Sequence, residues 1–281
     1  TEKHYMEERL SFGGIWSRDY GTVDSSGERV SQHFKLPKIS INNNFNNIRR
    51  WDRFVLNFNS DINYDTQPAQ LEVHPMLYGD IVGGGEEYPN AIQTLYGQRL
   101  VANNYLTTSY KLQRWNFMLS AQLCGDVEHM ESSLNGINDK GEIQASSPEL
   151  QNDILYARLD FVLTPSLQYS VGSKLTIQAD VPLDAMWLYT EDSINHMVTT
   201  NQTKVLCQPS LSINSSITSD LKLSARASYN EYYGSLYDSY GGYIMTDYRV
   251  TQRKAGDSHN TRSQTYNVEL SYGNAIDAIF A

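Results

Sequence analysis

The chain has 281 residues, of which 22 are Lys or Arg and 32 are Asp or Glu, so its formal net charge is −10. This charge argues against nucleic acid as a partner, because sequence-independent binding depends on basic side chains that neutralise phosphates. Apolar residues make up 40% of the chain, but no stretch approaches the roughly 20 consecutive apolar residues of a membrane-spanning helix. A helical membrane protein is therefore excluded. A transmembrane β-barrel stays open, since its apolar residues occupy only alternate positions.

Alternation of apolar and polar residues recurs along the chain and predicts about ten antiparallel strands. The clearest segments, in chain order, are residues 54–64, 115–123, 155–166, 174–189, 211–217, 221–228 and 266–272. Several hold the register for 12 or more residues, which exceeds the 5–6 residues typical of soluble strands. A transmembrane strand needs about 9–11 residues. The length and the persistently polar second face favour strands that cross a bilayer around a hydrated lumen.

Short and long connections alternate between the predicted strands. Short ones lie near residues 46–52, 113–114, 172–173, 218–220 and 273–274, and long ones near 17–32, 65–97, 129–152, 190–203 and 234–261. Aromatic residues such as Trp51, Trp115 and Trp187 collect near the segment ends, where rings suit a bilayer interface. This arrangement is typical of an outer-membrane barrel whose short turns face the periplasm.

Several features fit the strand pattern less simply. Pro165, Pro182 and Pro209 fall inside predicted strands, where each removes a ladder hydrogen bond, so they indicate bulges or strand ends. Residues 71–78 fit a further strand, a loop hairpin or an irregular cover. Cys124 and Cys207 lack any CxxC spacing, and we expect small buried or lipid-adjacent side chains rather than a disulfide.

Residues 229–243 form the richest candidate site, because six tyrosines are interspersed there with glycine and polar residues. Tyr rings offer flat apolar faces with a hydroxyl, which suits stacking on sugars or contact with another protein. The candidate ligand-binding residues on this extracellular loop are Tyr232, Tyr233, Tyr237, Tyr240 and Tyr243. The alternative is a tyrosine-rich interface girdle with a glycine-bent loop.

Charged residues on the polar face of the alternating segments form a second candidate group. Arg158, Asp160, Asp180 and Arg226 are predicted to face the lumen, with Glu269 on the same side. A ladder of opposite charges there would contact a plug or a translocating substrate. Solvated lumen charges without a specific partner explain the pattern equally well.

No motif predicts catalysis, a cofactor or a metal site. The six histidines lie mostly in predicted loops, and the nearest catalytic candidate, residues 257–260, has the composition of a solvated loop. Residues 135–142 offer oxygen ligands, but they lack the order of a calcium loop and fit a turn better. The three glycines at 83–85 are not followed by Gly-Lys-Ser/Thr, so we expect a mobile loop there rather than a phosphate site.

Most of the sequence resembles the barrel of TonB-dependent receptor-like outer-membrane proteins from Bacteroides-type bacteria. The residues that carry the resemblance are 103–106, 112–117, 211–225, 243–249, 263–268 and 270–280. It implies a barrel of about 22 strands in the bacterial outer membrane, which imports a bulky nutrient without bond chemistry. It also implies contact with membrane lipid, with the TonB complex through a plug domain, and with a surface lipoprotein.

The chain departs from that family in its extent. It contains no recognisable plug, TonB box or signal peptide, and at about 25 residues per strand it reaches only ten to twelve strands. We therefore expect residues 1–281 to form an antiparallel meander that is a segment of a larger barrel. Its first and last strands should then have open hydrogen-bonding edges.

Two rival functions fit the same pattern. A passive porin-like channel would have a closed ring and no plug, and a surface adhesin or carbohydrate-binding module would stack its long strands instead of exposing them to lipid. The loop composition fits iron chelates, cobalamin, oligosaccharides and peptides alike. Partition into detergent distinguishes the surface module from both membrane proteins.

Overall fold

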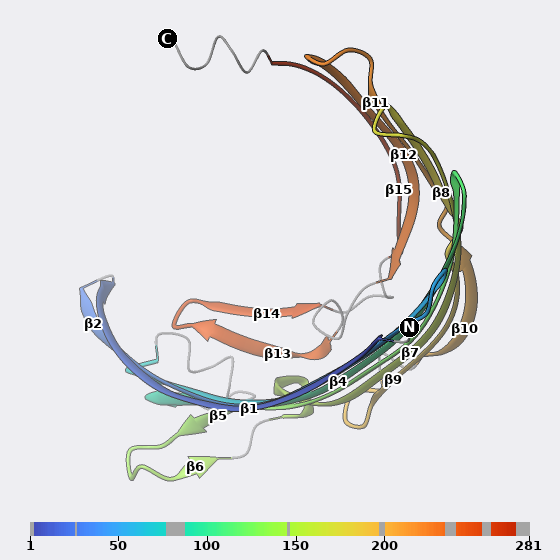
Figure 1. Cartoon of the computed structure of the whole chain (residues 1–281). Helices are drawn as coiled ribbons and strands as arrows, with labels where there is room; N and C mark the ends of the chain where they lie inside the picture. Colours follow the sequence, from blue (N-terminus) through green and yellow to red (C-terminus); the bar gives the residue numbers. More distant parts are fainter. Residues whose placement is uncertain are drawn as a thin grey trace.

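The chain forms one antiparallel sheet of long strands that curves into an open trough (Figure 1). The computed structural model describes residues 3–25, 27–76, 88–144, 147–196, 200–233, 240–254 and 260–273. In this part of the chain no helix is long and apolar enough to cross a bilayer. The single helical element among the described residues is one 3₁₀ turn, η1 (Pro148–Leu150).

The strands follow one another as a meander. Their bounds are β1 (Lys3–Ser25), β2 (Glu28–Arg50), β3 (Phe54–His74), β4 (Asn90–Leu112), β5 (Trp115–Ile137), β6 (Ile143–Gln144), β7 (Gln151–Val171), β8 (Leu175–Asp180), β9 (Leu183–Asp192), β10 (Thr200–Cys207), β11 (Ser210–Ser216), β12 (Leu221–Tyr233), β13 (Tyr240–Asp247), β14 (Val250–Lys254) and β15 (Asn260–Tyr272). The main order is β1-β2-β3-β4-β5-β7-β8-β11-β12-β15, and β9 and β10 extend the positions of β8 and β11.

The predicted all-β meander of about ten long strands is confirmed, and so is its open form. Within the described residues β1 pairs only with β2, and β15 pairs only with β12. Both end strands therefore carry unpaired backbone N–H and C=O groups along one edge. Within the described residues the sheet is thus an open, curved antiparallel wall and not a closed ring.

The turns confirm one end of the predicted pattern and correct the other. The short connections between β2 and β3, β4 and β5, β7 and β8, and β11 and β12 lie where the sequence predicts them. The predicted long loops at 17–32, 65–97 and 129–152 are wrong in extent, since β1 to β5 and β7 continue far into them. Residues 71–74 likewise belong to β3. In β2, β3, β4, β5 and β7 this extension carries inner side chains that are buried in the apolar clusters at that end.

The prolines lie at one level of the sheet. Pro182 separates β8 from β9 and Pro209 separates β10 from β11, as the strand-end interpretation predicts, whereas Pro165 remains inside β7. Each proline carbonyl accepts a bond of 3.1 Å from the next strand: Val181 N to Pro165 O, Gln208 N to Pro182 O, and Tyr229 N to Pro209 O. A proline has no N–H to return such a bond, so the ladder is interrupted while the strands stay in line.

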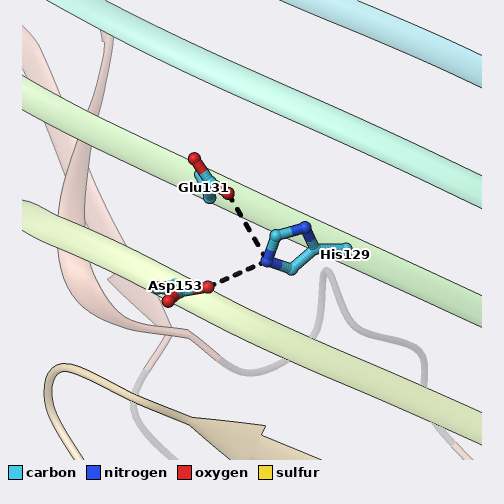
Figure 2. A group of neighbouring side chains, drawn as sticks. All are labelled: His129, Glu131 and Asp153. Carbon is cyan, nitrogen blue, oxygen red and sulfur yellow. Dashed lines mark hydrogen bonds and ion pairs between the residues drawn. The ribbon is translucent and has the colours of Figure 1, made fainter.

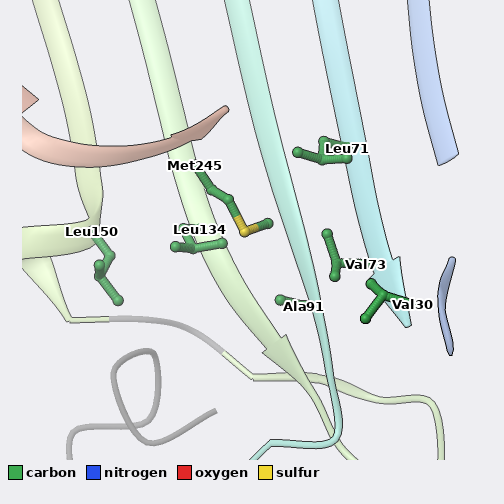
Figure 3. Close-up of a cluster of buried hydrophobic side chains, with 7 residues drawn as sticks. All are labelled: Val30, Leu71, Val73, Ala91, Leu134, Leu150 and Met245. Carbon is green, nitrogen blue, oxygen red and sulfur yellow. The ribbon is translucent and has the colours of Figure 1, made fainter. Parts of the chain in front are cut away.

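The two faces of the sheet differ in their side chains. Convex-face residues of β5 and β7 are apolar and exposed, for example Leu123 at 45% and Phe161 at 47%. The opposite, concave face carries polar residues and, at the loop end, a buried apolar cluster. Figure 3 shows that cluster: Val30, Leu71, Val73, Ala91, Leu134, Leu150 and Met245. Met245 comes from β13, so the core lies between the sheet and that strand.

Candidate functional site

The segment between β12 and β15 folds back onto the concave face as a two-stranded hairpin, β13–β14, which we call the inner hairpin (residues 240–254) (Figure 1). It lies at the loop end of the trough, across β4, β5 and β7. Residues 234–261 were predicted as a long external loop. The described part of that segment instead lies inside the curve of the sheet.

Three buried polar side chains hold the backbone of the inner hairpin. Asn152 of β7 donates from Nδ2 to Gly242 O at 3.2 Å and accepts from Gly242 N at 2.7 Å. Gln93 of β4 accepts from Met245 N at 2.9 Å, and Gln32 of β2 accepts from Tyr248 N at 3.2 Å. We call Gln32, Gln93 and Asn152 the anchor residues. Unpaired backbone groups are costly when buried, so these bonds fix the position of the hairpin.

Apolar packing supports the same placement. Tyr240 and Ile244 of β13 are buried against side chains of the sheet, namely Met130, Ile154, Tyr156 and Leu188. At Gly242 a Cβ atom would overlap the carbonyl oxygen of Gln151. Only glycine lets the hairpin approach β7 this closely.

The second strand of the hairpin presents a basic and aromatic surface. All of β14 is exposed. The Arg253 guanidinium lies 4.9 Å from the centre of the Tyr243 ring, and Arg249 lies 4.9 Å from that of Tyr248. Lys254 Nζ is 6.0 Å from the centre of the Tyr240 ring. In a chain with a net charge of −10, this concentration of cations over rings suits an anionic or aromatic ligand.

The five predicted ligand tyrosines occupy different environments. Tyr232 lies near the end of β12 and is 59% exposed, whereas Tyr240 is 6% exposed and packs in the apolar cluster. Burial raises the pKa of the Tyr240 hydroxyl, so the ring stays neutral. Tyr243 is half-buried beneath Arg253. Tyr237 and the side chain of Tyr233 lie outside the described residues.

The predicted charged residues lie on strands of the concave face. Arg158 and Asp160 form an ion pair on β7, with Nε to Oδ2 at 2.7 Å. Asp180 of β8 accepts from the neutral side chains of Gln178 and Ser210. Within the described part of the chain no ion pair joins Arg226 of β12, which is exposed. Arg158 and Asp160 are thus the one ion pair among these four residues, all of which the structure describes.

The sequence interpretation missed a second group of concave-face charges. Arg99 of β4 reaches Asp126 at 2.7 Å and Glu128 at 3.0 Å, both on β5. Glu128 lay just before the predicted loop at 129–152, and all three anchor residues lay within predicted loops. Extending the period of two beyond each predicted strand would have placed these residues on the concave face.

The loop segments that the sequence analysis judged to be weaker candidates remain. In residues 138–142 the Asn138 side-chain oxygen accepts from the backbone N–H groups of Lys140 and Glu142, which makes a turn. Residues 83–85 and 257–259 lie outside the described residues.

Another group that the sequence did not single out lies on the convex face, where His129, Glu131 and Asp153 converge. Figure 2 shows the imidazole between the two carboxylates.

No family model and no curated protein matches the sequence. Among solved structures, the chain is similar to the ferric yersiniabactin uptake receptor FyuA from Yersinia pestis, with a TM-score of 0.55 and 11% identity, over 95% of this chain and 43% of that one. The copper transporter OprC gives a TM-score of 0.53 and 9% identity, over 95% of this chain and 47% of that one. The chain thus spans less than half the length of these structures. Identity this low shows a shared fold, that of an outer-membrane barrel wall.

Proposed function

We propose that this chain is a barrel segment of an outer-membrane receptor that binds a nutrient at its extracellular end and imports it by TonB-coupled transport. The single observation that carries the proposal is the pairing of an outward apolar surface with a hairpin anchored inside the curve. The likeness to two uptake proteins in fold supports it. Assignment to a Bacteroides-type family rests on the sequence resemblance and stays a prediction.

The convex face has the dimensions of a bilayer. Exposed apolar side chains run along β5 from Trp115 to Val127, and we call this band, with its neighbours on β7 and β9, the apolar belt. Twelve residues of strand span about 40 Å, or about 30 Å when tilted like a barrel strand. Trp115 packs on Tyr169 at the turn end, and Trp187 stacks on Tyr189 towards the loop end. Rings at both limits suit the two interfaces.

The inner hairpin lies where an entering ligand would meet the protein. It sits at the loop end; its exposed strand β14 carries Arg253 and Lys254, and Arg249 lies in the turn just before it. In outer-membrane barrels the long loops face outward and the short turns face the periplasm, which supports an extracellular position for the loop end. We infer that β14 contributes to the binding surface and that import follows from binding and energised passage rather than from bond chemistry.

A passive channel is the second candidate, and the concave-face ion pairs favour it. Charges such as Arg99 and Asp126 on the inner side suit a hydrated pore, and a hairpin inside the curve would narrow it. This candidate needs neither a plug nor TonB.

Membrane fractionation and conductance test the proposal. The full-length protein should resist a high-salt wash of outer membranes and enter the detergent fraction. Purified into a planar bilayer, a receptor closed by a plug should give no steady conductance. Stable channel steps would instead identify the passive pore, and release by the salt wash would show a surface module and refute both.

Coupling to TonB is tested in cells. Cells that depend on the protein for a nutrient should lose uptake when TonB is deleted. Uptake that persists at the same rate without TonB would overturn the receptor proposal.

A further inference from the structure

We propose that His129, Glu131 and Asp153 bind a divalent transition-metal ion, with Zn²⁺ as the representative, on the outward face of the sheet. The three residues, which we call the His129 cluster, come from two adjacent strands (Figure 2). His129 and Glu131 are two positions apart on β5 and share a face. Asp153 of β7 is the register partner of Glu131.

The strand register separates this cluster from the inner hairpin. The intervening residues Met130 and Ser132 are buried on the concave side, and Ser132 accepts a bond from the anchor Asn152. Alternation therefore turns His129 and Glu131 to the convex side. The cluster lies beyond Val127, at the loop-end limit of the apolar belt, and the barrel lumen does not include it.

The spacing of the donor atoms fits a coordinated ion. His129 Nε2 lies 2.9 Å from Asp153 Oδ1 and 3.7 Å from Glu131 Oε1, and all three donors lie within 4.8 Å of one another. Zinc bonds to nitrogen and oxygen are about 2.0–2.2 Å, so adjacent donors in a tetrahedral site stand about 3.4 Å apart. Small side-chain rotations would bring the three donors to that spacing.

The charges leave the carboxylates available. Among the described residues, His129 is the only basic side chain within ion-pair distance of Glu131 or Asp153. Two carboxylates and a neutral imidazole neutralise a divalent ion, and an imidazole ligand favours zinc and its neighbours over calcium or magnesium. The imidazole must be unprotonated to bind, so affinity should fall in acid.

Space for the remaining ligands lies beside the cluster. Glu131 and Asp153 both line an open groove of about 570 Å³, which Thr94 and Tyr96 of the neighbouring strand β4 also line. The Glu131 side chain is 59% exposed. Water or another oxygen donor can therefore complete the coordination from outside, as in sites that keep an open position.

A metal titration tests the proposal. The full-length protein, purified in detergent without a histidine tag and stripped with a chelator, would be titrated with Zn²⁺ by calorimetry. Bound metal would be counted by mass spectrometry. We expect one equivalent. His129→Ala, Glu131→Gln and Asp153→Asn should each weaken binding by at least about tenfold, because even outer partners of metal ligands contribute that much.

The chain offers a matched control. His33 Nδ1 lies 3.8 Å from Glu72 Oε2, but Lys35 Nζ already binds that carboxylate at 3.2 Å. His33→Ala should therefore leave zinc binding unchanged. No saturable binding, or equal affinity in His129→Ala and wild type, would show only a hydrogen-bonded His–Asp pair and overturn the proposal. Since Glu131 is exposed, Glu131→Gln tests the site without disturbing the fold, whatever the membrane experiments give.

Discussion

The loop end and the turn end of the sheet are stabilised in different ways. At the loop end the inner hairpin covers the concave face, and Val30, Val73 and Leu134 are fully buried. Towards the turn end the described residues have no such cover, and apolar side chains such as Phe117 and Leu119 stay more than 40% exposed on the convex face. One end has a core like that of a soluble protein. The other has an apolar outer surface, which a bilayer would cover in the proposed membrane location.

The largest expected effect compares a leucine at each end. Leu134→Ala should lower the free energy of unfolding by about 2–5 kcal/mol, because it opens a cavity in the buried cluster. Leu123→Ala on the apolar belt should cost clearly less, since lipid fills the space left by the side chain. Urea unfolding of the full-length protein in lipid vesicles measures both. Equal losses of unfolding free energy in the two variants would mean that both leucines lie in the same kind of surroundings, which would contradict the difference between the two ends.

An arginine placed on either face of β5 tests which face meets lipid. Leu123→Arg on the convex face should destabilise the inserted protein by about 2–4 kcal/mol, as arginine does near a bilayer midplane. Gln122→Arg, one residue away on the concave face, should be tolerated because it meets water. The same vesicle assay reports both variants. A greater loss from Gln122→Arg would reverse the faces.

Removing an anchor residue tests how the hairpin is held. Asn152→Leu keeps the side-chain volume but leaves Gly242 N–H and C=O without partners, which should cost about 1–3 kcal/mol. Amide hydrogen exchange in residues 240–254 should rise accordingly. Asn116→Leu, near the turn end, should leave that exchange unchanged. Unaltered protection in Asn152→Leu would show that apolar packing alone holds the hairpin.

The smallest expected effect concerns the basic surface of β14. Arg253→Ala removes the cation over Tyr243 and should cost the hairpin about 0.5–1 kcal/mol, seen as a few-fold faster exchange in β14. Nutrient uptake should fall further than this loss of stability explains. Arg253→Lys keeps the charge and should retain most of both. Uptake unchanged in Arg253→Ala would remove β14 from the binding surface.

The local alternation of apolar and polar residues was enough to predict most of the strands and short turns at the turn end of the sheet. Gln113–Arg114 and Gly172–Ser173 are short turns between alternating segments, and the structure has them there. The anchor residues could not be found in this way. Asn152, Gln93 and Gln32 bind backbone groups that are 90, 152 and 216 positions away in the chain. Contacts at such separations leave no periodic trace around either partner.

The sequence by itself determined the long alternating strands and the side of each that is apolar, because side chains two positions apart share a face whatever the distant chain does. Only the tertiary structure decided that the segment after β12 turns inward, that Tyr240 is buried while Tyr232 is exposed, and that His129, Glu131 and Asp153 meet. Each of these depends on strand register and on packing between distant segments, which a repeat of two residues does not specify.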